Sequence, residues 1–131
     1  MISEEHTVRE LFRATDGGDL ARVLELLTDD VHFQFGNAEP AVGHDGFAAT
    51  AANLQTVVAG ISHDLNTVWT VQDPDPAVIC EMTVTYERHD GSRLTLPCAN
   101  VFRLRDGRIA DYRIYMDINP VLAADTAGAG S

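Results

Sequence analysis

Two Asp-Gly pairs divide the second half of the chain into three segments in which apolar and polar side chains alternate. The pairs are Asp90-Gly91 and Asp106-Gly107. An Asp-Gly pair between alternating segments is a strong hairpin signal, because glycine readily takes the positive φ that a tight turn needs. The sequence therefore predicts an antiparallel meander, and each polar residue on its strands must face either water or an enclosed space.

The first half of the chain predicts helices separated by short strands. Ser3 with the acidic residues after it is typical of a helix start, and Gly17-Gly18 ends that helix. Asp19 is placed to cap a second helix. Apolar spacing predicts a third helix from Phe47 to about residue 59. Alternating segments at 31–35 and 63–71 predict two further strands.

Length and charge limit the possible partners. With 131 residues, the chain is expected to form one domain over residues 1–122, followed by a disordered tail at 123–131. Nine Lys and Arg against 20 Asp and Glu give a net charge of −11. Such a surface repels nucleic acid and anionic membranes, so neither is expected as a partner. There is no apolar run of roughly 18 residues, which favours a cytoplasmic protein.

The sequence predicts no metal site and no cofactor. Cys80 and Cys98 lack the spacing of zinc ligands, and no phosphate-binding glycine loop or nucleophile elbow is present. If the Asp90-Gly91 turn has two residues, the cysteines lie on opposite faces of the sheet. Both are then expected to be free thiols in the core.

The ordered series of elements from about Thr7 to Leu122 resembles the NTF2-like, or SnoaL-like, superfamily. The phrases GDLARVLELLTDDVHF, GHDGF and VFRLRDGRIADYRIYMD are similar to its helix entry, its loop after the first strand and its terminal hairpin. The resemblance implies an α+β cone, in which N-terminal helices pack on a strongly curved antiparallel sheet around a cavity. It also implies a homodimer through the convex sheet face. Relatives include ketosteroid isomerases and limonene-type epoxide hydrolases, so the fold does not define the reaction.

The catalytic residues of both relatives are replaced here. At the positions of the isomerase tyrosine and aspartate stand Leu11 and Phe35, whereas Asn100 occupies the position of the second oxyanion donor and keeps a hydrogen-bond donor there. The set that activates water in the epoxide hydrolases is replaced by Glu81, Thr83, Ile114, Phe33 and Phe35. Phe33, Phe35 and Ile114 are instead expected to form an apolar cavity floor that suits a hydrophobic, ring-containing ligand.

Strand pairing leads to a candidate catalytic pair. A two-residue Asp90-Gly91 loop places Glu81 opposite Asn100. Glu81, enclosed by apolar groups, is then a candidate proton carrier, and Thr83 shares its face. The opposite, apolar face would form the dimer contact through Val78, Met82, Val84 and Val101. The reverse arrangement, with the apolar face inward and Glu81 on the surface, is the alternative.

His63 and the last strand complete the candidate site. His63 opens a strand and is either a general acid or base or a structural histidine bonded to the backbone. On the last strand, a glycine bulge would turn Tyr112 and Met116 inward with Ile114, and its absence would turn Arg113, Tyr115 and Asp117 inward. The family alignment favours the bulge, which makes Tyr112 a cavity hydroxyl.

Together these observations predict a cofactor-independent lyase, isomerase or cyclase that transfers a proton on a carbonyl-containing ring compound. Glu81 or His63 would move the proton, and Asn100 with Tyr112 would bind the enolate oxygen. The alternatives are a non-catalytic ligand-binding domain and a dimerisation module with a filled interior.

Overall fold

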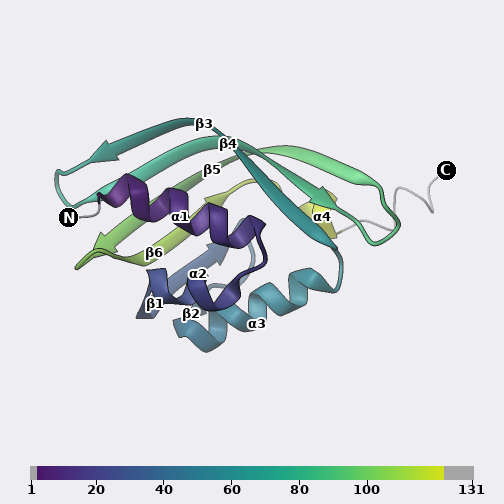
Figure 1. Cartoon of the computed structure of the whole chain (residues 1–131), viewed down its shortest axis with the longest axis horizontal. Helices are drawn as coiled ribbons and strands as arrows, with labels where there is room; N and C mark the ends of the chain where they lie inside the picture. The colour runs from purple at the N-terminus through teal and green to yellow at the C-terminus, as the bar shows by residue number, and fades with distance from the viewer. Residues whose placement is uncertain (1–2, 123–131) are drawn as a thin grey trace.

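The protein is described by a computed structural model that covers residues 3–122, so the predicted tail at 123–131 lies outside the described residues. The elements in chain order are α1 (Glu4–Asp16), α2 (Leu20–Leu26), β1 (Leu27–Phe35), β2 (Ala41–Val42), α3 (Gly43–Gln55), β3 (Gly60–Val71), β4 (Ala77–Glu87), β5 (Arg93–Arg105), β6 (Arg108–Tyr115) and α4 (Asn119–Leu122). The strands form one sheet in the order β2-β1-β6-β5-β4-β3 (Figure 1). Only β1 and β6 are parallel. Within the described part, no helix is long and apolar enough to cross a membrane.

The first two helices begin where the sequence predicts. The Ser3 hydroxyl accepts a hydrogen bond from the backbone N–H of His6, and the Asp19 carboxylate accepts one from the N–H of Arg22, each at 3.1 Å. These bonds satisfy N–H groups that a helix start leaves without partners. The third helix begins at Gly43, before the predicted Phe47, because β2 pairs with β1 and leads the chain directly into it.

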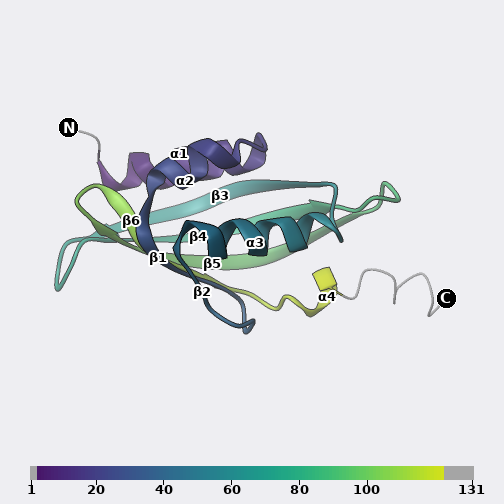
Figure 2. The ribbon, with the colours of Figure 1, turned by 90° about the horizontal axis from the view of Figure 1, so that it is seen from below.

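The helices cover one face of the sheet, which we call the concave face, and leave the convex face open. Figure 2 shows α1 and α2 lying over one side of the strands. Val8 and Leu11 of α1 and Phe102 of β5 have no exposed surface. Burial of a side chain of this size contributes about 1.5–3 kcal/mol to stability, so this contact holds α1 on the sheet.

The turn between β4 and β5 differs from the prediction by one residue. The N–H of Arg88 donates to the carbonyl of Ser92 at 2.8 Å, which leaves three residues, 89–91, in the loop. The Asp90 carboxylate accepts from the N–H and the hydroxyl of Ser92 at 2.9 and 2.6 Å, and this local bonding favours the longer loop. As a result Cys80, not Glu81, lies opposite Asn100.

A shift of one residue moves every side chain of a strand to the other face. Val78, Met82 and Val84 therefore point toward the helices and are 0–2% exposed, so their predicted role in a convex dimer contact is wrong. The reverse arrangement that the sequence left open holds for β4 but not for β5, where Asn100 lies inward and Val101 lies on the convex face. Self-association through the convex face stays a prediction.

Tyr112, Ile114 and Met116 face the cavity, as predicted, but the bulge that turns them inward is not in the turn between β5 and β6. The loop of this turn has only two residues, Asp106 and Gly107, with φ of 53° and 79°. The register shifts further along, between the pairs Leu104–Ile109 and Arg103–Asp111. This bulge lies in the strand and not in the turn, and it points Tyr112 toward the helices.

Both cysteines are buried free thiols, as predicted. The geometric argument for this was wrong, because both lie on the concave face. Cys80 pairs with Asn100 and Cys98 pairs with Met82, so the two thiols are diagonal and not direct neighbours across β4 and β5.

Candidate functional site

A cavity of about 420 Å³ lies between the helices and the concave face. Its wall is mainly apolar and includes Val23, Leu54, Val58, Ile61, Val84 and Met116. Residues of α1, α2, α3 and β3–β6 all contribute, together with Phe33 and Phe35 of β1. The volume falls within the range of small-molecule sites, so the interior is not filled as a pure dimerisation module would require.

Packed aromatic rings form one wall of the cavity. The ring centroid of Phe33 lies 4.8 Å from that of Phe47 and 4.9 Å from that of Tyr112, and Phe102 packs on Tyr112 at 4.6 Å. Such edge and tilted contacts hold the rings in place. The wall therefore offers a preformed aromatic surface to a ligand.

The strongest polar feature of the cavity is a pair formed by Asp16 and His63. The two carboxylate oxygens of Asp16 each make one bond: Oδ1 lies 2.6 Å from His63 Nδ1, and Oδ2 accepts from the His63 backbone N–H at 2.9 Å. The ring of Phe12 packs against the imidazole in a tilted arrangement, with the ring centroids 4.7 Å apart. The side chains of His63 and Asp16 are only 6% and 28% exposed. The two hydrogen bonds and the contact with Phe12 therefore hold the His63 ring in place.

This geometry decides how the imidazole is protonated. A carboxylate is an acceptor only, so the nitrogen that it contacts carries the proton. In neutral His63 the proton therefore sits on Nδ1, and Nε2 keeps its lone pair. The pair has the arrangement of a carboxylate-oriented general base.

A second polar group, Asn100, lies on β5. It is 1% exposed, and its Oδ1 accepts a hydrogen bond from Cys98 Sγ at 3.3 Å. Its Nδ2 is buried without a partner. A buried donor left unpaired costs about 1–3 kcal/mol, so a bound water or an acceptor on a ligand would be stabilised by this N–H group.

Burial keeps the other polar groups of the wall protonated. Desolvation raises the pKa of the Tyr112 hydroxyl well above its usual value, and does the same for Tyr86. The Tyr86 hydroxyl donates to Met116 Sδ at 3.6 Å. Desolvation also raises the pKa of Cys98 to about 11. At neutral pH these groups act as hydrogen-bond donors and not as bases.

The structure brings most of the predicted site residues to this cavity and moves two of them away. The cavity is lined by His63, Asn100, Tyr112, Phe33, Phe35, Ile114 and Met116. Glu81 is exposed and Thr83 lies on the same convex face. The expected contact of Glu81 with Asn100 is wrong, because Glu81 pairs with Ala99. Glu81 therefore has no access to the cavity.

Sequence reasoning missed Asp16 and Phe47 as parts of the site. Asp16 is the last residue of α1, and the Gly17-Gly18 turn directly after it gave the only local signal of a special position. Its partner lies 47 residues further along the chain. No local pattern connects the two, because α1 and β3 meet only in the folded sheet.

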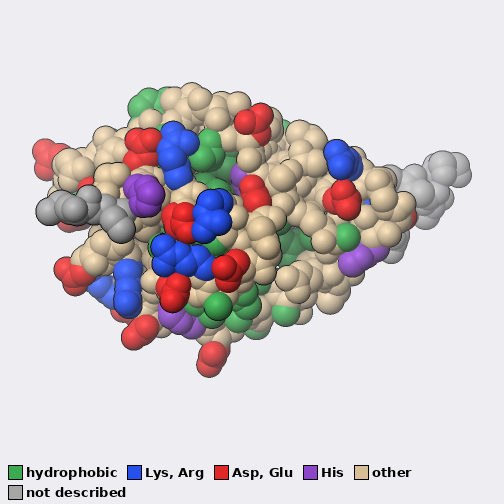
Figure 3. Space-filling view, in the orientation of Figure 1, with side chains coloured by type: hydrophobic (Ala, Val, Ile, Leu, Met, Phe, Trp, Pro, Cys, Tyr) green, Lys and Arg blue, Asp and Glu red, His purple; other side chains and the backbone are tan. Residues whose placement is uncertain are grey.

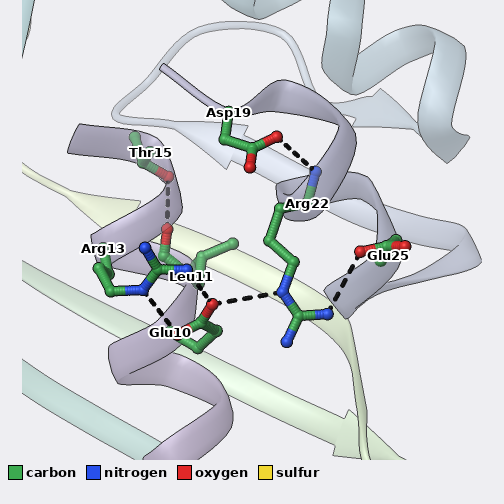
Figure 4. A network of polar contacts seen from close by, with 7 residues as sticks. All are labelled: Glu10, Leu11, Arg13, Thr15, Asp19, Arg22 and Glu25. Carbon is green, nitrogen blue, oxygen red and sulfur yellow. Dashed lines mark hydrogen bonds and ion pairs between the residues drawn. The ribbon is translucent and has the colours of Figure 1, made fainter. Parts of the chain in front are cut away.

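A network of charges on the surface links α1 to α2. Glu10 accepts from Arg13 Nε at 2.8 Å and from Arg22 Nε at 3.3 Å, and Arg22 reaches Glu25 at 3.3 Å (Figure 4). The hydrogen bond from Arg13 lowers the pKa of Glu10 to about 2. Figure 3 shows these charges gathered over α1 and α2. The network steadies the helix that ends in Asp16.

Comparison with known proteins assigns the family. The model of the SnoaL-like domain matches residues 8–112. The chain belongs to the SnoaL-like family. Among residues 3–122, no group of three or more His, Cys, Asp or Glu could hold a metal ion.

Several solved structures share the fold of this chain. An NTF2-like protein of unknown function from Burkholderia pseudomallei is 21% identical with a TM-score of 0.82, covering 96% of this chain and 97% of its own. A candidate polyketide cyclase from Xanthomonas campestris is 22% identical with a TM-score of 0.77, covering 92% and 94%. TerC, co-crystallised with polyporic acid, is 18% identical with a TM-score of 0.79, covering 98% of each chain. These likenesses confirm the predicted α+β cone.

Proposed function

We propose that the cavity binds a small hydrophobic ring compound with a carbonyl group, and that the Asp16–His63 pair moves a proton on it. The activity is that of a cofactor-independent lyase, isomerase or cyclase. The observation that carries the proposal is the carboxylate-oriented imidazole in the wall of an apolar cavity. The names of polyketide cyclases among similar structures, and the co-crystallisation of TerC with polyporic acid, agree with a ring-containing ligand.

The roles follow from the protonation states. His63 Nε2 accepts a proton from a carbon α or γ to the carbonyl, and the electron pair of that C–H bond moves through the conjugated system to the carbonyl oxygen. Asn100 Nδ2 and the Tyr112 hydroxyl donate hydrogen bonds to the oxyanion. The imidazolium formed is stabilised by Asp16 and returns the proton to carbon.

The carbonyl group and the carbon that loses its proton must both lie between His63 and Asn100. His63 pairs with Val84 and Asn100 pairs with Cys80, which places their backbone positions four residues apart along β4. At 3.3 Å per residue this is about 13 Å along the strand. The two side chains and the ligand together bridge this separation.

Solvent exchange tests the proposal. We expect the protein to speed the exchange of the α and γ protons of octalone, a fused bicyclic enone, in D₂O, as followed by proton NMR. His63→Gln removes the base and should lower the rate roughly 10²-fold or more. Asp16→Asn should cause a similar loss, because its amide donates to Nδ1 and shifts the imidazole proton to Nε2.

Two matched controls separate the site from general damage. Asp64→Asn changes the neighbour of His63 on β3, and Glu81→Gln changes the exposed carboxylate on β4; both should leave exchange within about twofold, as surface changes do. Binding of octalone without faster exchange would reject catalysis in favour of a ligand-binding domain. A loss in Glu81→Gln as large as that in His63→Gln would reject the assignment of the base.

A further inference from the structure

The side chain of Cys98 holds Asn100 in one orientation. Among the described residues, the Cys98 thiol makes a hydrogen bond to Asn100 and to no other group. The Cys98 thiol lies two residues earlier on the same face of β5, and its Sγ is 3.3 Å from Asn100 Oδ1. Cys98 remains an S–H donor at neutral pH, because burial raises its pKa to about 11. A thiol that donates needs the oxygen of the carboxamide, and not its nitrogen, on its side.

Among residues 3–122, no group satisfies the other end of the carboxamide. Nδ2 of Asn100 is buried and unpartnered. The residues paired with Asn100 on either side are Cys80 and Ile114, neither of which offers an oxygen from its side chain. Both Cys98 and Asn100 line the cavity.

We propose that Cys98 is a positioning residue that holds the Asn100 carboxamide with its N–H toward the cavity, so that the site selects ligands with an oxygen acceptor and rejects ligands that offer only a donor. The proposal rests on the cavity being the ligand site of the proposed function. It adds a rule of selectivity: a carbonyl or enolate oxygen is recognised, whereas an N–H group of the same size meets another donor. A carboxamide free to turn over would accept either kind of ligand.

Binding titrations with two pairs of fused bicyclic ligands test this rule. Octalone carries a carbonyl and octalin is the same skeleton without oxygen; indole carries an N–H donor and indene replaces that nitrogen by carbon. For the wild-type protein we expect octalone to bind about tenfold more tightly than octalin, and indole to bind no more tightly than indene.

Substitution of Cys98 should change the selectivity and not only the affinity. In Cys98→Ala the Asn100 carboxamide can rotate so that its oxygen and nitrogen exchange places. The preference for octalone over octalin should then fall to about threefold or less, and indole should bind about threefold more tightly than indene. Cys98→Ser keeps a donor and should restore the wild-type pattern. Asn100→Leu should remove both preferences while octalin still binds. A merely structural role of Cys98 would weaken all four ligands alike.

The side-chain amide signals of Asn100 in ¹⁵N NMR spectra provide a direct readout and should shift with octalone but not with octalin. Failure of octalone to bind at its solubility limit, equal binding of octalone and octalin to the wild type, or an unchanged pattern in Cys98→Ala would overturn the proposal. His63→Gln should retain the wild-type preferences. In the wild-type protein, the preferences without any proton exchange would reject only the proposed function, and proton exchange without the preferences would reject only this inference.

Discussion

The two faces of β4 and β5 differ sharply although the same two strands form both. Met82, Val84 and Phe102 on the concave face are at most 2% exposed, whereas Glu81 and Thr95 on the convex face are exposed. The concave face meets the helices and the cavity, so apolar side chains there lose contact with water. The comparison teaches that alternation along a strand identifies two faces, and only the packing of the helices decides which is inside.

Polar residues on the two faces have different meanings for the same reason. Glu81 on the convex face is a solvated carboxylate, and water satisfies it without any partner. Asn100 on the concave face is 1% exposed and has a donor without a partner. An unpaired polar group is informative only where water cannot reach it.

The largest expected effect tests the difference in burial between the concave and convex faces. Phe102→Ala removes a ring that is fully buried between α1 and β6, and should lower the free energy of unfolding by about 3–5 kcal/mol. Thr83→Ala, on the convex face, should change it by no more than about 0.5 kcal/mol. Urea unfolding measures both. Equal losses for the two variants would contradict the assignment of the faces.

The thiols of the concave face should make stability depend on pH in the alkaline range. Burial raises the pKa of Cys80 and Cys98 from 9.0 to about 11. The folded protein then holds these protons more tightly than the unfolded chain, so their contribution is complete below pH 9 and is lost as the pH rises toward 11. The slope is about 1.4 kcal/mol per pH unit for each thiol.

Urea unfolding at a series of alkaline pH values measures this slope. The double variant Cys80→Ala, Cys98→Ala should show a shallower decline than the wild type over the same range. An identical decline in both proteins would show that the thiols are not buried as described. The convex face contains no cysteine, so a variant such as Thr95→Ala provides the control.

The smallest expected effect concerns the charge network between α1 and α2, which lies on the surface. Glu10→Gln removes the negative charge shared by Arg13 and Arg22, and should lower the melting temperature by about 1–3 °C near neutral pH. The pKa of Glu10 is lowered from 4.5 to about 2, so its contribution is present above pH 4.5 and is lost as the pH falls toward 2. The difference between variant and wild type, measured by circular dichroism melts, should shrink over that range. A difference that grows on acidification would contradict this account.

Much of the fold could be predicted because its signals are local. The Ser3 and Asp19 caps, the Gly17-Gly18 break and the Asp-Gly turns each depend on residues within a few positions of one another. The apolar members of the site, such as Phe33 and Ile114, followed from the family resemblance. The register of the β4–β5 hairpin did not follow, because a bond from Ser92 to Asp90 lengthens the loop by one residue.

The sequence by itself determined the family, the order of the elements and the presence of both an apolar and a polar face on each strand. Only the tertiary structure decided that Glu81 lies outside, that Asn100 lies opposite Cys80 and not Glu81, and that Asp16 meets His63. The physical reason is the range of the interactions. Caps and turns act over a few residues, whereas the face of a strand and a contact between α1 and β3 depend on the packing of segments far apart in the chain.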